Sequence, residues 1–400
     1  MTWLTHLREA QWLDGSRVRG YAVLIGLASL ALLANSYMKA MTPTGSDFLA
    51  FWGAGHVTVA GDPAAAYDLA VQRQVQTGPD TGIAAEGFFA FVNPPPFLFV
   101  TAPFGALPFP AAWLAWVVLG YAVWAFAAVR AFPRLWPLVL VFPGALVAAG
   151  HAQAGFVTGA LLVGAVALVD RRPVLSGVLI GMLIVKPHLA LLLPFWLAAG
   201  GRWRTFVAAA ASAAGLLLVS WAVFGTATML AYTTSWDASA QIMRLGDDDF
   251  HLRMATLYGQ LRLIMPAGPA LAANGLLALA VVWLVMRSWR VFGQANGQAG
   301  IATGALALAA TALASPYLFN YDLPFLVLPL LWLVHQGLEH SFRPYEKLLL
   351  VALFFAPYAT RAAALPLHVN LMPLAVAVLV WLVWRRGQQL ASLAKGAPAA

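Results

Sequence analysis

Two ionisable residues stand out in a chain whose residues are mostly apolar. Asp47 follows the first long apolar run, and Lys186 lies in a strongly apolar stretch where a lysine has little room to extend toward water. Carboxylates exchange protons with hydroxyl groups, and ammonium groups attract anions. Ionisable groups at membrane depth are energetically costly and usually line a cavity or a pathway. Asp47 and Lys186 are therefore the first candidates for proton transfer and anion binding.

Further polar residues occur in turns that share one side of the membrane in the topology inferred below. Because such residues are rare between apolar runs, their convergence predicts one polar chamber that opens to the outer leaflet. The residues are His151 and Gln153, His188, Arg253, Tyr317, Asn320, Tyr321, Asp322 and Arg361.

Each candidate also has a purely structural interpretation. Asp47 could cap a helix that begins at Phe48. The histidines could be hydrogen-bonded loop residues, and Tyr321 with Asp322 could anchor the start of a helix at the interface. The acidic run 247–249 is interpreted as a solvated tip, with a metal site there as the alternative.

Composition identifies the solvent that surrounds these residues. Of the 400 residues, 62% are hydrophobic and only 10% are charged, whereas a soluble domain carries about 25% charge. The net charge of +8 comes from small basic groups between apolar runs, which does not favour nucleic-acid binding. With no cysteine, the chain has neither disulfides nor thiol metal ligands. These features predict a multi-pass membrane protein whose first apolar run, 18–38, is an anchor and not a cleaved signal.

The basic groups indicate how the chain is oriented, because cytoplasmic loops are enriched in Lys and Arg. Placing these groups inside puts both termini in the cytoplasm and most acidic residues outside. The predicted inner groups are Arg8/Arg17/Arg19, Arg130/Arg134, Arg171/Arg172, Arg202/Arg204, Arg287/Arg290, Arg343/Lys347 and Arg385/Arg386/Lys395.

Seven inner groups require twelve crossings, several of them short. The stretch 174–200 could be one kinked helix, but two short helices that turn at Lys186 agree better with the charge rule. Such a turn would lie within a protein-lined cavity. The predicted crossings are 18–40, 110–130, 136–149, 154–169, 173–186, 188–200, 205–223, 268–288, 299–314, 322–336, 346–358 and 370–385.

Two outer segments, 42–110 and 225–266, are long enough to be more than turns. Within the first, 48–58 and 64–76 are predicted as short interfacial helices, the second of them capped by Asp62-Pro63. No soluble domain boundary is evident, so residues 1–400 are predicted to form a single membrane domain.

Several short motifs carry a resemblance to a known family. After the first crossing come Ser46-Asp47-Phe48, Ala60-Gly61-Asp62-Pro63 and Tyr67-Asp68; later come Asn93-Pro94-Pro95-Pro96, Gly150-His151-Ala152-Gln153, Val185-Lys186-Pro187, and Ser315-Pro316 with Tyr321-Asp322. In order and spacing, over residues 46 to about 330, the chain resembles glycosyltransferase family 87. That family includes bacterial polyprenol-phosphate-mannose-dependent α-1,2-mannosyltransferases.

Two positions depart from the family pattern. Gln153 does not directly follow Gly150, because His151 and Ala152 intervene, and Tyr317 stands where many members have His. A role for that histidine in binding the donor phosphate is therefore not transferred to this chain.

The resemblance implies the GT-C fold, an all-α integral membrane bundle of about twelve (10–13) transmembrane helices with a catalytic Asp in the first outer loop. It implies that Asp47 is the general base for an acceptor hydroxyl, with Asp322 as the next candidate. Lys186 would stabilise the departing phosphate, with help from His188, Arg253 or Arg361. The pocket would also contain His151, Gln153, Tyr317, Asn320 and Tyr321.

The implied reaction is inverting transfer of mannose, or of another hexose or pentose, from a polyprenyl-phosphate donor to a glycolipid or glycan on the extracytoplasmic face. It needs no cofactor, and no metal is expected. Two other classes remain open. A transporter or flippase of lipid-linked sugars should have ionisable groups near the midplane or on both sides, and an assembly factor would need no converging acid and base.

Overall fold

The computed structural model describes residues 3–83, 85–292 and 299–396. Within these ranges every regular element is a helix, and the only β pairing is an isolated antiparallel bridge between Met254 and Phe319. The architecture is therefore all-α, as predicted.

In the part of the chain that the structure describes, six helical segments are long and apolar enough to cross a bilayer. A bent pair, Pro133–Leu140 with Pro143–His151, would make seven if it forms one span. The two halves of the pair meet at 50°. These segments fit a multi-pass membrane protein. The six are α2 (Gly15–Ala40), α6 (Phe109–Ala131), the part of α12 (Trp203–Leu245) from Trp203 to Asp237, α15 (Ala267–Phe292), η7 (Asn320–Leu326) continued by α17 (Val327–His340), and α18 (Glu346–Leu367).

All twelve predicted crossings coincide with helical structure, but the predicted count of about twelve spans is not confirmed. Helix α9 (Gly155–Leu168) has 14 residues, which rise only about 21 Å against roughly 30 Å of hydrocarbon. Helix α16 (Ala299–Ala314) is almost entirely enclosed by protein. Hydropathy predicts both as crossings because buried helices and lipid-facing helices are equally apolar.

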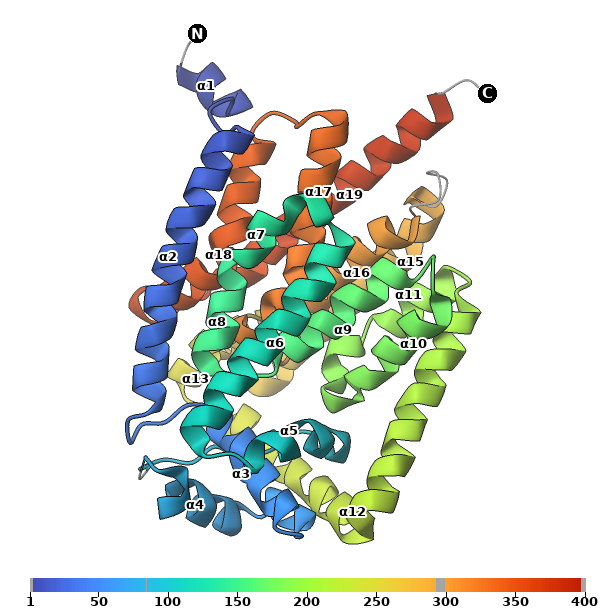
Figure 1. Ribbon diagram of the computed structural model, residues 1–400. Coiled ribbons are helices and arrows are strands. Elements are labelled where there is room, and N and C mark those ends of the chain that lie inside the picture. The colour runs from blue at the N-terminus through green and yellow to red at the C-terminus, as the bar shows by residue number, and fades with distance from the viewer. Residues whose placement is uncertain (1–2, 84, 293–298, 397–400) are drawn as a thin grey trace.

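Long outer helices flank this enclosed centre. Only 6% of the most apolar 18-residue window is buried in α2 and in α12, against 78% in the span formed by η7 and α17. Figure 1 shows α2 in blue and α12 in yellow-green on opposite flanks of the molecule. Their exposed leucines, including Leu24, Leu30 and Leu218, suit a hydrocarbon environment.

The stretch 174–200 is interrupted where the sequence predicts a turn. Helix α10 (Pro173–Gly181) passes into the 3₁₀ turn η5 (Met182–Val185), and η6 (Pro187–Ala190) leads into α11 (Leu193–Ala199). Between them Lys186 has φ −151° and ψ 70°, a non-helical conformation favoured by the following proline.

The first outer segment folds into short helices. Helix α3 (Phe48–Val59), predicted as a short interfacial helix, has nine of its twelve residues buried within the protein. It packs closely on α5 (Leu98–Gly105): a Cβ on Gly55 would lie 2.3 Å from the Thr101 carbonyl oxygen. The remaining elements are η1 (Pro63–Tyr67), α4 (Leu69–Thr77), η2 (Pro79–Thr81) and η3 (Pro95–Phe97).

The second outer segment, 225–266, is largely helical. At Gly225, φ is 80° and ψ is 168°, a conformation that only glycine adopts readily, and α12 bends there and continues to Leu245. Helices α13 (Asp248–Arg253) and α14 (Leu257–Arg262) follow.

Both chain ends lie at the same end of the molecule, and α3, α4 and α5 lie at the opposite end (Figure 1). The elements that hold the polar turns lie between these two ends. The other helices are α1 (Trp3–Glu9), η4 (Pro133–Leu135), α7 (Trp136–Leu140), α8 (Pro143–His151) and α19 (Met372–Gly396).

Candidate functional site

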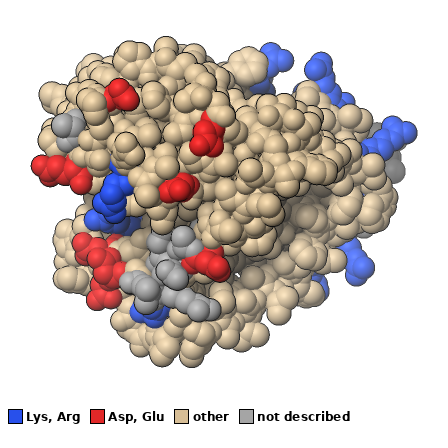
Figure 2. Space-filling model, turned by 90° about the horizontal axis from the view of Figure 1, so that it is seen from below, with Lys and Arg blue, Asp and Glu red and all other residues tan. Residues whose placement is uncertain are grey.

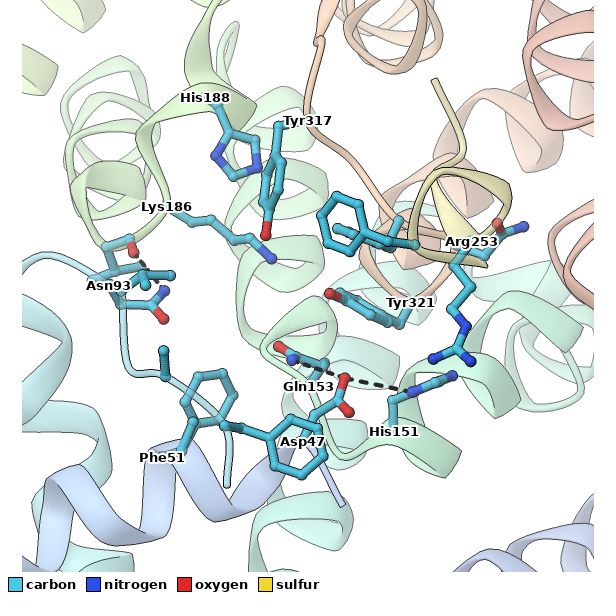
Figure 3. A pocket seen from close by; sticks show the side chains of 18 of the residues that line it. Asp47, Phe51, Asn93, His151, Gln153, Lys186, His188, Arg253, Tyr317 and Tyr321 are labelled. Atoms are coloured by element: carbon cyan, nitrogen blue, oxygen red, sulfur yellow. Dashed lines mark hydrogen bonds and ion pairs between the residues drawn. The ribbon is translucent and has the colours of Figure 1, made fainter. Parts of the chain in front are cut away.

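The polar turns converge on one cavity of about 660 Å³. Of the eleven residues predicted for the site, only Asp322 does not line it; it lies behind Lys186. Figure 3 shows the cavity with Asp47 and Gln153 on one side and His188 with Tyr317 on the other. The predicted residues that line the cavity are Asp47, His151, Gln153, Lys186, His188, Arg253, Tyr317, Asn320, Tyr321 and Arg361.

The Asp47 carboxylate is directed to other side chains and does not cap helix α3. Asp47 occupies the N-cap position, but its side chain makes no capping hydrogen bond. One oxygen, Oδ2, instead accepts a hydrogen bond from Gln153 Nε2 at 3.2 Å and lies 3.5 Å from His151 Nδ1. These are the contacts drawn as dashed lines in Figure 3. With 24% of its side chain exposed, Asp47 remains accessible from the cavity.

The end of helix α8 places both partners of Asp47. Ala152 adopts the left-handed conformation, with φ 49° and ψ 41°. The Gln153 N–H donates to the Ala148 carbonyl oxygen, and the Ala152 N–H donates to that of Ala149, a pattern that satisfies the last carbonyls of a helix. This reversal of the chain lets His151 and Gln153, two positions apart, contact the same carboxylate.

The surroundings of Asp47 favour its ionised form. Burial raises the pKa of this carboxyl, but the hydrogen bonds from His151 and Gln153 and the charge of Arg253 lower it by more. The resulting pKa lies below the ordinary value of 3.8. At neutral pH, Asp47 is therefore a carboxylate that can accept a proton.

Two arginines supply positive charge near this carboxylate. Arg253, at the end of α13, has one long contact to the exposed Asp249, at 4.0 Å. Within the described ranges Arg361, on α18, makes no hydrogen bond or ion pair, although both arginines interact electrostatically with Asp47. Guanidinium groups with free donors are well suited to bind a phosphate.

Lys186 is paired with Asp322. The Lys186 ammonium donates to Asp322 Oδ1, and Asp322 Oδ2 accepts the backbone N–H of Phe319 at 3.1 Å. Both side chains are buried, at 10% and 0% exposure. The lysine still lines the cavity, but the carboxylate of Asp322 largely neutralises its charge. Asp322 itself is not accessible to a substrate.

The remaining predicted residues differ in how fully their polar atoms are bonded. Asn320 donates to the carbonyl oxygen of Pro357 and accepts from Asn370, so it mainly ties η7 to α18. His188 meets Tyr317 edge to face, 5.6 Å between ring centroids. Its Nε2 is buried and has no hydrogen-bond partner within the described ranges. Burial raises the pKa of Tyr317 well above its usual value, so its hydroxyl is a neutral donor.

Sequence reasoning missed an aromatic part of the lining. Phe51, Phe89, Tyr232, Trp236 and Phe250 all border the cavity. Aromatic residues are so frequent in this chain that no local signal distinguishes these five. Aromatic rings beside a few polar groups are typical of the lining of small-molecule sites.

Asn93 connects the first outer segment to the lysine turn. Its Nδ2 donates to the carbonyl oxygen of Val185 at 3.1 Å, and its own carbonyl oxygen accepts from Tyr67 Oη at 2.9 Å. The prolines that follow Asn93 could have indicated this rigid part of the cavity wall, in which Pro94 is extended and Pro95 begins the 3₁₀ turn η3.

Two acidic residues of the second outer segment also contribute to the cavity lining. Asp247 and Asp249 line it, and Asp247 also caps α13 through the Phe250 N–H. In the view from below, Asp and Glu side chains are spread over this face, and several Lys and Arg side chains stand at its edge (Figure 2). In the part of the chain that the structure describes, no group of three His, Asp or Glu residues could hold a metal ion.

Comparison with known proteins identifies the family. Neither the curated proteins nor the solved structures gave a match. The model of glycosyltransferase family 87 matches residues 91–316, a segment that contains Gln153, Lys186 and Arg253 and makes up more than half of the 400 residues. The chain therefore belongs to glycosyltransferase family 87.

Proposed function

We propose that the protein transfers a sugar from a polyprenyl-phosphate donor to a hydroxyl group of a glycolipid or glycan, with inversion at the anomeric carbon. The observation that carries the proposal is the Asp47 carboxylate. It is ionised, is not used as a helix cap, and shares one cavity with two arginines whose donors are available.

In the proposed reaction, Asp47 takes the proton from the acceptor hydroxyl. The oxygen forms a bond to the anomeric carbon, and the bond from that carbon to the phosphate oxygen breaks. The electron pair leaves with the lipid phosphate. Because the attacking and leaving oxygens lie on opposite faces, configuration inverts. The leaving group is already an anion, so the reaction requires neither a metal nor a cofactor.

The positive charges of the cavity would bind the donor phosphate. Arg253 and Arg361 are the strongest candidates because their guanidinium groups have free donors. Lys186 and His188 would contact the phosphate from the opposite wall. Charge fixed where negative charge develops is a large contribution to catalysis.

We further propose that the cavity opens on the extracytoplasmic side of the cytoplasmic membrane, with both termini in the cytoplasm. The basic groups of the loops predicted to be cytoplasmic support this orientation. The aromatic wall would contact the sugar and the first isoprene units. Mannose is the first donor sugar to test, followed by other hexoses and pentoses.

The test is a transfer assay with the purified protein, a panel of radiolabelled polyprenyl-phosphate sugars and a membrane lipid extract. Transfer from one of the donors should label a component of the extract. Adding a metal chelator should not change this result. Asp47→Asn should reduce turnover by about 10²- to 10⁴-fold, the usual size of a general-base contribution, whereas the exposed Asp80→Asn should not.

Three results would contradict this proposal. The first is that no donor in the panel labels the extract. The second is that labelled lipid moves across a vesicle membrane without transfer, which would indicate a transporter. Near-normal transfer by Asp47→Asn would exclude this carboxylate as the base.

A further inference from the structure

We infer that His151 and Gln153 are positioning residues that hold one oxygen of Asp47 and keep its carboxylate ionised, leaving the other oxygen for the acceptor hydroxyl. This inference rests on the proposed function, since it assigns the base of that reaction. It goes beyond it by giving two neighbouring side chains a defined task.

The first support is the geometry around a single oxygen. Gln153 Nε2 and His151 Nδ1 both approach Asp47 Oδ2, at 3.2 and 3.5 Å. Asp47 Oδ1 has no hydrogen-bond partner among the described residues. A carboxylate held on one oxygen by two donors presents its other oxygen in a fixed direction (Figure 3).

The second support is the way in which the two donors are themselves fixed. They flank Ala152, a non-glycine residue with φ 49°, a left-handed conformation that L-residues rarely adopt. The hydrogen bonds of Gln153 and Ala152 to the end of α8 hold this turn in place. The ring of His151 also lies 5.2 Å from that of Tyr321, which restricts its rotation.

Other groups also face Asp47 and must be considered in any test by pH. Arg253 from α13 and Arg361 from α18 place positive charge near Asp47, and the phenol groups of Tyr317 and Tyr321 also face it. Among the described residues, none of these four groups hydrogen-bonds to the Asp47 side chain, whereas His151 and Gln153 do. Removing either donor should remove an interaction that lowers the pKa of Asp47, while burial continues to raise it. The pKa of Asp47 should therefore rise.

The experiment measures the pH dependence of kcat for sugar transfer in wild type, His151→Leu and His151→Gln. In His151→Leu the ring donor is lost, so kcat at neutral pH should fall about 10- to 100-fold, as for a charge-assisted hydrogen bond. The acid limb should move to higher pH by about one unit or more, with the donor KM nearly unchanged. His151→Gln retains a neutral donor and should recover much of kcat.

A second variant covers the case in which His151→Leu fails to fold. Gln153→Glu places a carboxylate beside Asp47 and should move the acid limb in the same direction. Unshifted limbs in both folded variants would overturn the inference. Disappearance of the limb in His151→Leu would also overturn it, because His151 would then be the titrating base. If wild type transfers no sugar from any donor, the proposed function itself fails.

Discussion

At the scale of single residues, a carboxylate in this cavity is functional or structural according to its partners. Asp47 is accessible and is contacted by His151 and Gln153, whereas Asp322 is fully buried and satisfied by Lys186 and the Phe319 N–H. Sequence alone predicted both at the site. It gave no indication of the pairing, because Lys186 and Asp322 are 136 positions apart. The roles assigned to individual site residues stay predictions.

Substitutions in the Lys186–Asp322 pair can distinguish a structural role of Lys186 from a role in binding phosphate. Lys186→Met leaves a buried carboxylate without its counter-ion and should destabilise the protein by about 3–5 kcal/mol. Combining it with Asp322→Asn removes that charge and keeps an acceptor for Phe319, so thermal stability should largely return. If Lys186 also binds the donor phosphate, the double variant should be stable but about 10- to 150-fold less active.

The Lys186 experiment measures unfolding in detergent together with transfer, with Asp322→Asn alone as the control. A double variant with normal activity would show that Lys186 is structural only. Wild-type stability of Lys186→Met would contradict the buried pair.

At the scale of helices, sequence patterns located the elements but not their surroundings. Every predicted crossing coincides with helical structure, and the chain breaks at Lys186-Pro187 as expected. The patterns could not show that α16 is enclosed by protein or that α3 is buried. A helix enclosed by protein and a helix in contact with lipid have equally apolar compositions. Among the described residues, six or seven segments are long and apolar enough to span a bilayer, against twelve predicted crossings.

The close packing of α3 on α5 should be needed for stability. In Gly55→Ala the new methyl group would meet the Thr101 carbonyl oxygen at 2.3 Å. Forcing the helices apart should destabilise the protein by about 1–3 kcal/mol and reduce transfer, because α3 begins next to Asp47. Gly20→Ala, on α2, meets nothing within 4 Å and should be neutral or slightly stabilising. Equal melting temperatures for the two variants would contradict this packing.

At the scale of the whole molecule, the position of the termini predicts the topology. Both ends lie away from α3, α4 and α5 (Figure 1), and the basic groups favour cytoplasmic termini. A reporter fused after Ala40 should be extracytoplasmic, and reporters after Arg172 or Arg290 should be cytoplasmic. Protease accessibility or alkaline phosphatase activity in cells measures this. An extracytoplasmic Arg172 would overturn the proposed orientation of the cavity.

The residues that line the cavity extend beyond both ends of the segment that matches the family. The matched segment, 91–316, includes Lys186 but ends before Asp322 and Arg361, and it begins after Asp47. A polypeptide trimmed to that segment would retain a buried lysine without its counter-ion and would lack the carboxylate of the site. We therefore expect that the segment matched by the family model is not active on its own. Domain-swap or truncation experiments on this chain should keep residues 47 through 361 together.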